Sequence, residues 1–89
     1  MLMKYEWDGK KNQSNVEERG IDFELAHDLD WDTVIEAQDM RVESEVRMRA
    51  YGLIDNRLCC FIYTMRGDIC RVISLRKANK REVREYGKA

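Results

Sequence analysis

The chain has 89 residues, of which 44% are hydrophobic and 37% charged, and its formal net charge is −1. A chain of this length closes one hydrophobic core, so we predict a single domain over residues 1–89. Because the sequence has neither an apolar run of about 18 residues nor the charged and apolar regions of a signal peptide, we expect a cytoplasmic protein with no membrane segment.

The first third of the chain is predicted to form a short strand and two helices. The strand covers residues 3–7, and Asp8 follows it as an N-cap whose carboxylate can accept hydrogen bonds from the free N–H groups of a first helical turn. Gly20 ends this helix, because glycine readily adopts the left-handed conformation found after helices. Asp22 caps a second helix, which extends to about Leu29.

The rest of the chain is predicted to be mostly β-structure. Alternating and continuous apolar patterns predict strands over residues 33–37, 46–54, 58–65 and 69–76. Asn79 then caps a C-terminal helix, and Glu82 completes a capping box three residues later. This order predicts an α+β fold, an antiparallel sheet of about four to five strands with two N-terminal helices and one C-terminal helix packed on one side.

Charge is unevenly distributed along the sequence. Residues 22–45 contain nine acidic side chains and one basic one, Arg41, whereas residues 71–89 contain seven basic side chains and two acidic ones. The basic end suits a polyanion such as nucleic acid, and the acidic segment suits a basic partner protein. The alternative is that both are solvated surfaces that attract each other.

No residue pattern predicts a metal site, a cofactor or a disulfide. Cys59 and Cys60 are adjacent and would point to opposite faces of a strand, and together with Cys70 they fit small buried residues. The single histidine, His27, lies among acidic residues and fits a surface position. The sequence also has no glycine-rich phosphate loop and no nucleophile elbow. We therefore expect neither a metal nor a cofactor.

A polar stripe runs along the first predicted helix. Lys11, Asn15 and Arg19 recur every four residues and so lie on one drifting face. A stripe of this kind beside a sheet suits a phosphate backbone, although the pattern alone favours a solvated helix surface.

A second candidate cluster lies at the end of the last predicted strand. Strict alternation places Ser74 and Arg76 on the same face as Cys70 and Val72, with Leu75 on the opposite face. Arg66 lies at the neighbouring hairpin. An arginine fork donates two parallel hydrogen bonds to a phosphate, so the cluster indicates a cationic cleft lined by a hydroxyl group.

Three groups of residues, in one order and spacing, resemble a known family. They are Trp7-Asp8-x-x-Lys11-x-x-x-Asn15 with Gly20-x-x-Phe23-x-x-Ala26, Arg47 and Gly52 with Tyr63-Thr64-x-Arg66-Gly67, and Arg71-Val72-Ile73-Ser74-Leu75-Arg76-Lys77-Ala78 with Lys80-Arg81-Glu82 and Tyr86. Over nearly its whole length the chain resembles the BrnT toxins, ribonucleases of type II toxin–antitoxin systems.

The resemblance implies a RelE-like fold and metal-independent cleavage of RNA that arrests growth. It also implies a small cognate antitoxin, BrnA, whose dimerisation would give a heterotetramer. In that family the antitoxin binds operator DNA, so the toxin would reach DNA only through its antitoxin.

The resemblance and the two clusters together predict the site. The residues that match basic and polar motif positions of the family are Lys11, Arg47, Arg66, Ser74 and Arg76. We predict that the catalytic residues are Lys11, Arg19, Ser74 and Arg76. We predict that the RNA-binding residues are Asn15, Arg47, Arg66, Lys77, Lys80 and Arg81.

One position departs from the family pattern. Where the family usually has Lys-His-Gly, this chain has Glu18-Arg19-Gly20. An imidazole exchanges protons near neutral pH, whereas arginine stays charged and can only stabilise negative charge.

The mechanism that the resemblance implies is attack of an RNA 2′-hydroxyl on its own 3′-phosphate. Arg76, Arg19 and Lys11 would neutralise the developing charge, and Ser74 would orient the phosphate. The residue that transfers the proton is left open, and the candidates are Lys11, Glu82 and Tyr86.

Two other functions are weighed against this one. The first is a weakened or inactive toxin that binds its antitoxin and acts in operon autoregulation, which Arg19 favours. The second is an RNA-binding domain without toxicity, which the sequence disfavours because no exposed aromatic residues for base stacking are predicted on the sheet.

Overall fold

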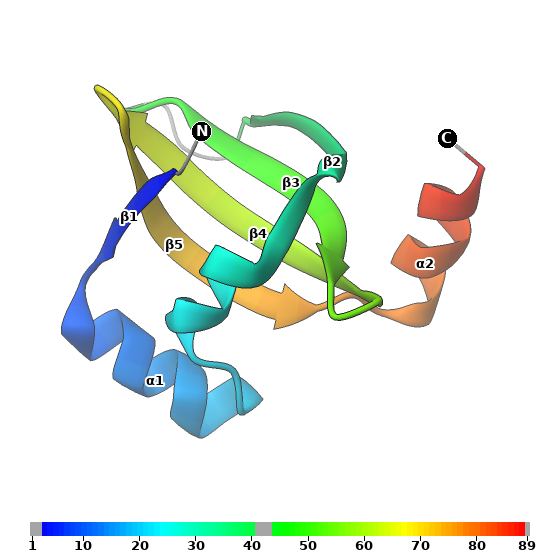
Figure 1. The fold of residues 1–89 in the computed structure, drawn as a ribbon, viewed down its shortest axis with the longest axis horizontal. Coiled ribbons are helices and arrows are strands. Elements are labelled where there is room, and N and C mark those ends of the chain that lie inside the picture. The colour runs from blue at the N-terminus through cyan, green and yellow to red at the C-terminus, as the bar shows by residue number, and fades with distance from the viewer. Residues whose placement is uncertain (1–2, 41–43, 89) are drawn as a thin grey trace.

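The computed structural model describes residues 3–40 and 44–88, so Arg41 and Glu43 of the acidic segment lie outside the described residues (Figure 1). Its elements, in chain order, are β1 (Lys4–Trp7), α1 (Gly9–Arg19), the 3-10 helix η1 (Phe23–Asp28), β2 (Leu29–Asp39), β3 (Arg47–Ile54), β4 (Arg57–Arg66), β5 (Ile69–Lys77) and α2 (Lys80–Gly87). The predicted α+β class is confirmed.

The sheet is mixed and not purely antiparallel as predicted. Its strand order is β1-β5-β4-β3-β2, and β1 pairs with β5 in parallel while the other neighbours are antiparallel. After β1 the chain forms α1 and η1, and β2 then lies at the opposite edge of the sheet. The strands from β2 to β5 follow one another back across the sheet. β1 therefore meets only the last strand, and the two run in the same direction.

The predicted helix ends are confirmed more closely than the predicted helix type. The Asp8 carboxylate accepts from the N–H groups of Lys10 and Lys11, and Gly20 has a left-handed φ of 69°. The second predicted helix is a 3-10 helix of 6 residues. It ends at Asp28, close to the predicted end, because Leu29 is already extended and pairs with Ile54. β2 therefore begins before its predicted start.

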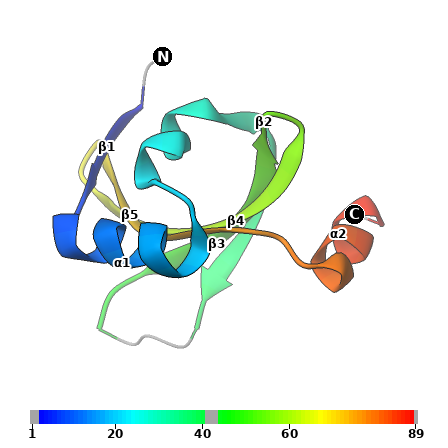
Figure 2. The ribbon, with the colours of Figure 1, turned by 90° about the horizontal axis from the view of Figure 1, so that it is seen from below.

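One face of the sheet packs against η1 and forms the core. Phe23 and Ala26 of η1 are buried against Ala50, Phe61 and Leu75 of the three central strands. Figure 2 shows η1 above this face, with α1 lying toward the edge of the sheet near β5. Burial of these large apolar side chains is the main source of stability in a domain of this size.

A bulge in β5 changes which side chains reach this core. Ile62 of β4 pairs with Ser74 and the next residue, Tyr63, pairs with Val72, so Ile73 is an extra residue in β5. An extra residue reverses the alternation beyond it. Leu75 therefore joins Val72 in the core, and Ser74 points to the other face. The predicted assignment of these faces was wrong for this reason.

The helices do not pack on one side as predicted. Glu82 of α2 binds Tyr51 and Arg76, which lie on the sheet face opposite η1, and the Tyr86 hydroxyl donates to the Thr33 carbonyl at 2.5 Å. No side chain of α2 is buried. We call the sheet face opposite η1 the open face, because α2 covers only one end of it (Figures 1 and 2).

Candidate functional site

Arginines from neighbouring strands gather on the open face. Strand register and alternation place side chains of β3, β4 and β5 there in transverse rows. These side chains are Arg47, Arg49 and Tyr51 of β3, Cys60, Ile62 and Arg66 of β4, and Arg71, Ser74 and Arg76 of β5. Neighbouring strands lie about 4.8 Å apart, so side chains of β3 and β5 in one row are separated by about 10 Å.

Most of these arginines have a carboxylate partner. The ion pairs are Arg47–Glu45 at 2.7 Å, Arg49–Asp39 at 3.5 Å, Arg71–Glu6 at 3.6 Å and Arg76–Glu82 at 2.7 Å. Arg66 has no ion pair within residues 3–40 and 44–88. A polyanion bound to this face could therefore pair directly with Arg66. It could pair with the other arginines only by displacing their carboxylate partners.

A groove lies where α1 runs beside the edge of β5. Because β1 ends at Trp7, which pairs with Val72, the later part of β5 has no strand neighbour on this side. The Asn15 amide group, buried at this point, donates to the carbonyls of Ile21 and Leu75 at 2.8 Å each. These two hydrogen bonds hold α1 against the free edge of β5.

This α1–β5 groove brings together three of the four predicted catalytic residues. Lys11, Arg19 and Ser74 line a cavity of about 280 Å³. The other lining residues are Lys10, Ser14, Asn15, Glu18 and Ile73. The predicted fourth, Arg76, is two residues beyond Ser74 on the open face. The bulge at Ile73 is what turns Ser74 away from the core.

The groove carries an excess of positive charge. Lys10, Lys11 and Arg19 stand against one carboxylate, Glu18, and none of these four side chains has an ion pair within the described part of the chain. An exposed groove of this kind favours an anion of the size and charge of a phosphate group.

Sequence reasoning missed Glu18. It lies seven residues after Lys11 and four after Ser14, so it falls on the same side of α1. This spacing is visible in the sequence, but the predicted stripe includes only Lys11, Asn15 and Arg19. Glu18 is the one carboxylate among the residues that line the groove.

Arg76 is engaged by α2. Its two Nη atoms donate to the two carboxylate oxygens of Glu82 at 2.7 and 2.9 Å. Glu82 also accepts from the Asn79 N–H and from the Tyr51 hydroxyl, and the capping box predicted for this helix is confirmed. The hydrogen bonds from Arg76 lower the pKa of Glu82 to about 2, and Glu82 in turn raises the pKa of Arg76.

These contacts bear on the predicted proton-transfer groups. Glu82 accepts hydrogen bonds from three residues, and Tyr86 donates its hydroxyl proton to a backbone carbonyl. Both side chains thus anchor α2 to the sheet. Lys11 is the one predicted candidate that lines the groove.

The predicted RNA-binding residues fall in different places. Asn15 is 7% exposed and both its amide hydrogens are used within the protein, so the structure gives it a positioning role. Lys77 pairs with Cys59 of the core and lies on the η1 side, away from the groove. Lys80 is exposed in the first turn of α2.

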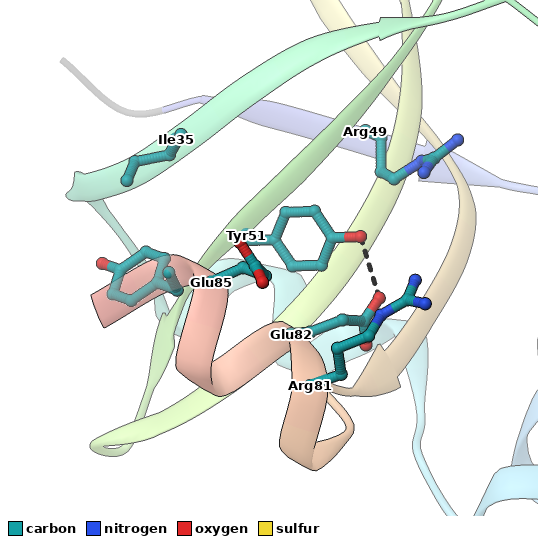
Figure 3. A pocket seen from close by; sticks show the side chains of 7 residues that line it. Ile35, Arg49, Tyr51, Arg81, Glu82 and Glu85 are labelled. Carbon is teal, nitrogen blue, oxygen red and sulfur yellow. Dashed lines mark hydrogen bonds between the residues drawn. The ribbon is translucent and has the colours of Figure 1, made fainter. Parts of the chain in front are cut away.

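Arg81 lines a second cavity, between α2 and the strands β2 and β3 (Figure 3). We call it the α2 cavity. Its other lining residues are Ile35, Arg49, Tyr51, Glu82, Glu85 and Tyr86. Tyr51 thus presents a half-buried aromatic side chain on the open face, where the sequence predicted no exposed aromatic residue.

The described residues contain no group of three or more histidine, cysteine, aspartate and glutamate side chains that could hold a metal ion. Cys59, Cys60 and Cys70 are free and buried, as predicted. Within residues 3–40 and 44–88, no helix is both long and apolar enough to cross a membrane.

Comparison with known proteins identifies the family. The family model described as "Ribonuclease toxin, BrnT, of type II toxin-antitoxin system" matches residues 7–82. The fold is similar to the 1.1 Å crystal structure of the Brucella abortus ribonuclease toxin BrnT, with a TM-score of 0.61 and 26% sequence identity over 88% of this chain and 99% of that one. No curated protein matches the chain. The chain therefore belongs to the BrnT family of ribonuclease toxins of type II toxin–antitoxin systems.

Proposed function

We propose that this protein is an endoribonuclease toxin that cleaves single-stranded RNA without a metal ion, with the scissile phosphate held in the α1–β5 groove. The observation that carries the proposal is the composition of the groove. Lys10, Lys11 and Arg19 surround one carboxylate and the Ser74 hydroxyl at a free strand edge. Such a site offers charge neutralisation, orientation and a proton acceptor together.

The reaction is a transesterification within the RNA. Glu18 takes the proton of the 2′-hydroxyl while the 2′-oxygen forms a bond to phosphorus. The bond from phosphorus to the 5′-oxygen breaks, and the Lys11 ammonium group gives that oxygen its proton. The products are a 2′,3′-cyclic phosphate and a 5′-hydroxyl group, and water then returns the proton from Glu18 to Lys11.

Arg19 and Ser74 act on the phosphate itself. Arg19 remains charged at neutral pH and so stabilises the negative charge of the pentacoordinate state without exchanging a proton. The Ser74 hydroxyl donates to a phosphate oxygen and orients it. With arginine in place of the family histidine, proton transfer falls to Glu18 and Lys11.

The RNA strand continues from the groove over the open face. Arg66 is available to a phosphate directly, and Arg47 and Arg49 can exchange their carboxylate partners for phosphates. Electrostatic binding of this kind depends strongly on salt concentration.

A type II toxin is paired with an antitoxin, and we infer that a BrnA-type protein neutralises this chain. The acidic residues of β2 suit a basic segment of that partner. Dimerisation of the antitoxin would give a heterotetramer, which binds operator DNA through the antitoxin alone.

The geometry of Arg76 favours one alternative. With its guanidinium bound by Glu82, and with Arg19 unable to exchange protons, the chain could serve as an antitoxin-binding module that has lost its nuclease activity. This alternative shares the fold and the antitoxin but predicts no RNA cleavage.

Induced expression in bacteria tests the proposal. We expect wild type to arrest growth with loss of RNA, Lys11→Ala to relieve the arrest, and the exposed control Lys88→Ala to leave it unchanged. Co-expression of a BrnA-type antitoxin should restore growth. Soluble wild-type protein that leaves growth and RNA intact would support the alternative, an antitoxin-binding module without nuclease activity. If Arg19→His then arrested growth, the loss of nuclease activity would be assigned to the arginine at position 19.

A further inference from the structure

The aromatic side chains of this protein divide into two groups. One group packs ring against ring in or beside the core: Tyr5, Trp7, Phe23, Trp31, Phe61 and Tyr63. Among the described residues, Tyr51 and Tyr86 make no ring contact of this kind. Both line the α2 cavity (Figure 3). The two aromatic side chains outside the core therefore line the same cavity.

We propose that the α2 cavity binds a nucleobase of the RNA strand, and that this base is guanine. The proposal rests on the proposed function, since it names a base that the same substrate would carry. It adds a binding site on β2, β3 and α2, separate from the α1–β5 groove.

The apolar part of the cavity wall is held in position. Ile35 lies across from Tyr51 in the register of β2 and β3, and its side chain is 43% exposed. The Tyr51 hydroxyl is fixed by Glu82 at 2.8 Å, and the Tyr86 hydroxyl is fixed by the Thr33 carbonyl. The hydrogen bonds of their hydroxyl groups hold the two rings in place along the cavity, and an aromatic face is the surface on which a base stacks.

The polar groups of the cavity match the edges of guanine. Glu85 is a carboxylate without an ion pair in the described part of the chain, and it can accept from the two adjacent N–H donors of the guanine Watson–Crick edge. Arg81, also without an ion pair there, can donate to the O6 and N7 acceptors of the same base. Uracil, cytosine and adenine each have only one donor group on this edge, so none of them offers the adjacent pair.

The cavity lies within reach of the groove along one strand row. Arg49 lines the cavity, Ser74 lines the groove, and Ile62 pairs with both between them. The separation is about 10 Å, two strand spacings. A short stretch of one RNA strand can therefore place its phosphate in the groove and a neighbouring base in the cavity.

Binding of RNA that cannot be cleaved tests this site on the full chain. We would measure the affinity of fluorescein-labelled 2′-O-methyl tetranucleotides UUGU, UUAU, UUCU and UUUU by fluorescence anisotropy. Wild type should prefer UUGU over UUUU, and Tyr51→Ala should weaken UUGU binding by about 5- to 150-fold, the range of base–aromatic stacking. Tyr51→Phe, which keeps the ring, should retain most of the affinity.

Variants of two exposed residues on α2 test the proposed hydrogen bonds to the edges of guanine. Glu85→Gln should reduce the preference for UUGU while UUUU binding stays the same. Arg81→Ala should weaken UUGU binding more than its matched control on the same helix, Arg84→Ala. Equal binding of all four probes by wild type, or an unchanged preference in Glu85→Gln, would overturn the proposal. The probes lack the 2′-hydroxyl, so the result is independent of whether the groove cleaves RNA.

Discussion

The Asn15 amide group donates to the Leu75 carbonyl at 2.8 Å, a contact between residues 60 positions apart. The same nitrogen donates to the Ile21 carbonyl, so one buried side chain joins α1, the turn after it and the free edge of β5. The groove has its shape because these three segments meet there. The functional role of Asn15 follows from this position.

Asn15→Ala should destabilise the protein. The substitution leaves the Leu75 and Ile21 carbonyls without their donor, and unsatisfied buried groups cost about 1–3 kcal/mol each, before relaxation or water entry. We expect the free energy of unfolding in urea to fall by about 2 kcal/mol in total. Gln13→Ala, an exposed change on the same helix, should alter it by less than about 0.5 kcal/mol. Equal effects of the two changes would show that the contact does not hold the groove.

Glu82→Gln should loosen α2 while the sheet remains folded. The neutral amide keeps part of the capping box but loses the charge-assisted hydrogen bonds from Arg76, worth about 2 kcal/mol. Amide hydrogen exchange should therefore accelerate in residues 80–87 and stay unchanged in β4. Glu85→Gln provides the matched control on the same helix, where we expect no acceleration. Protection of α2 that survives in Glu82→Gln would mean that other contacts hold it.

Docking of α2 should depend on pH in the acid range. The pKa of Glu82 is lowered from 4.5 to about 2, chiefly by the hydrogen bonds from Arg76. A folded-state pKa below the unfolded value stabilises the docked form in full above about pH 4.5, and this stabilisation is lost as the pH falls toward 2. The side-chain NMR signals of Tyr51 should report the change. The same signals in Glu82→Gln should lack this transition, and a transition of equal size there would assign it to another group.

RNA affinity should fall steeply with salt and should depend on Arg66. The logarithm of the binding constant falls by about 0.7 per neutralised phosphate for each tenfold rise in salt on single strands. Arg66→Ala should reduce this slope by about that amount. Arg57 pairs with Ile54 of the core and lies on the η1 side, so Arg57→Ala should leave the slope unchanged. Identical slopes for the two variants would exclude the open face as the path of the RNA.

Local signals predicted most of the elements of this fold. Asp8, Gly20 and Asn79 act through their immediate neighbours, so their capping roles were readable from the sequence. The parallel pairing of β1 depends on where the chain re-enters the sheet, which no local pattern encodes. The bulge at Ile73 is also a tertiary feature, because Leu75 is drawn into the core by its neighbours and not by strict alternation.

The candidate site was predicted in part. Lys11, Arg19 and Ser74 were identified, and they line one groove. The buried role of Asn15 could not be predicted, because its two acceptors are backbone carbonyls brought close only by folding. The contact between Arg76 and Glu82 was likewise hidden, since the sequence shows a capping glutamate but not the strand arginine beneath it.

Cleavage of single-stranded RNA by the purified chain in the presence of EDTA tests the central claim most directly. Wild type should yield 2′,3′-cyclic phosphate and 5′-hydroxyl ends, and Glu18→Gln should lower the rate by about 10²- to 10⁴-fold, the usual contribution of a proton-transfer group. Glu17→Gln, the same change one residue earlier on α1, should retain the wild-type rate. Cleavage by Glu18→Gln at the wild-type rate, or an RNA-binding wild type that yields no products, would contradict the account.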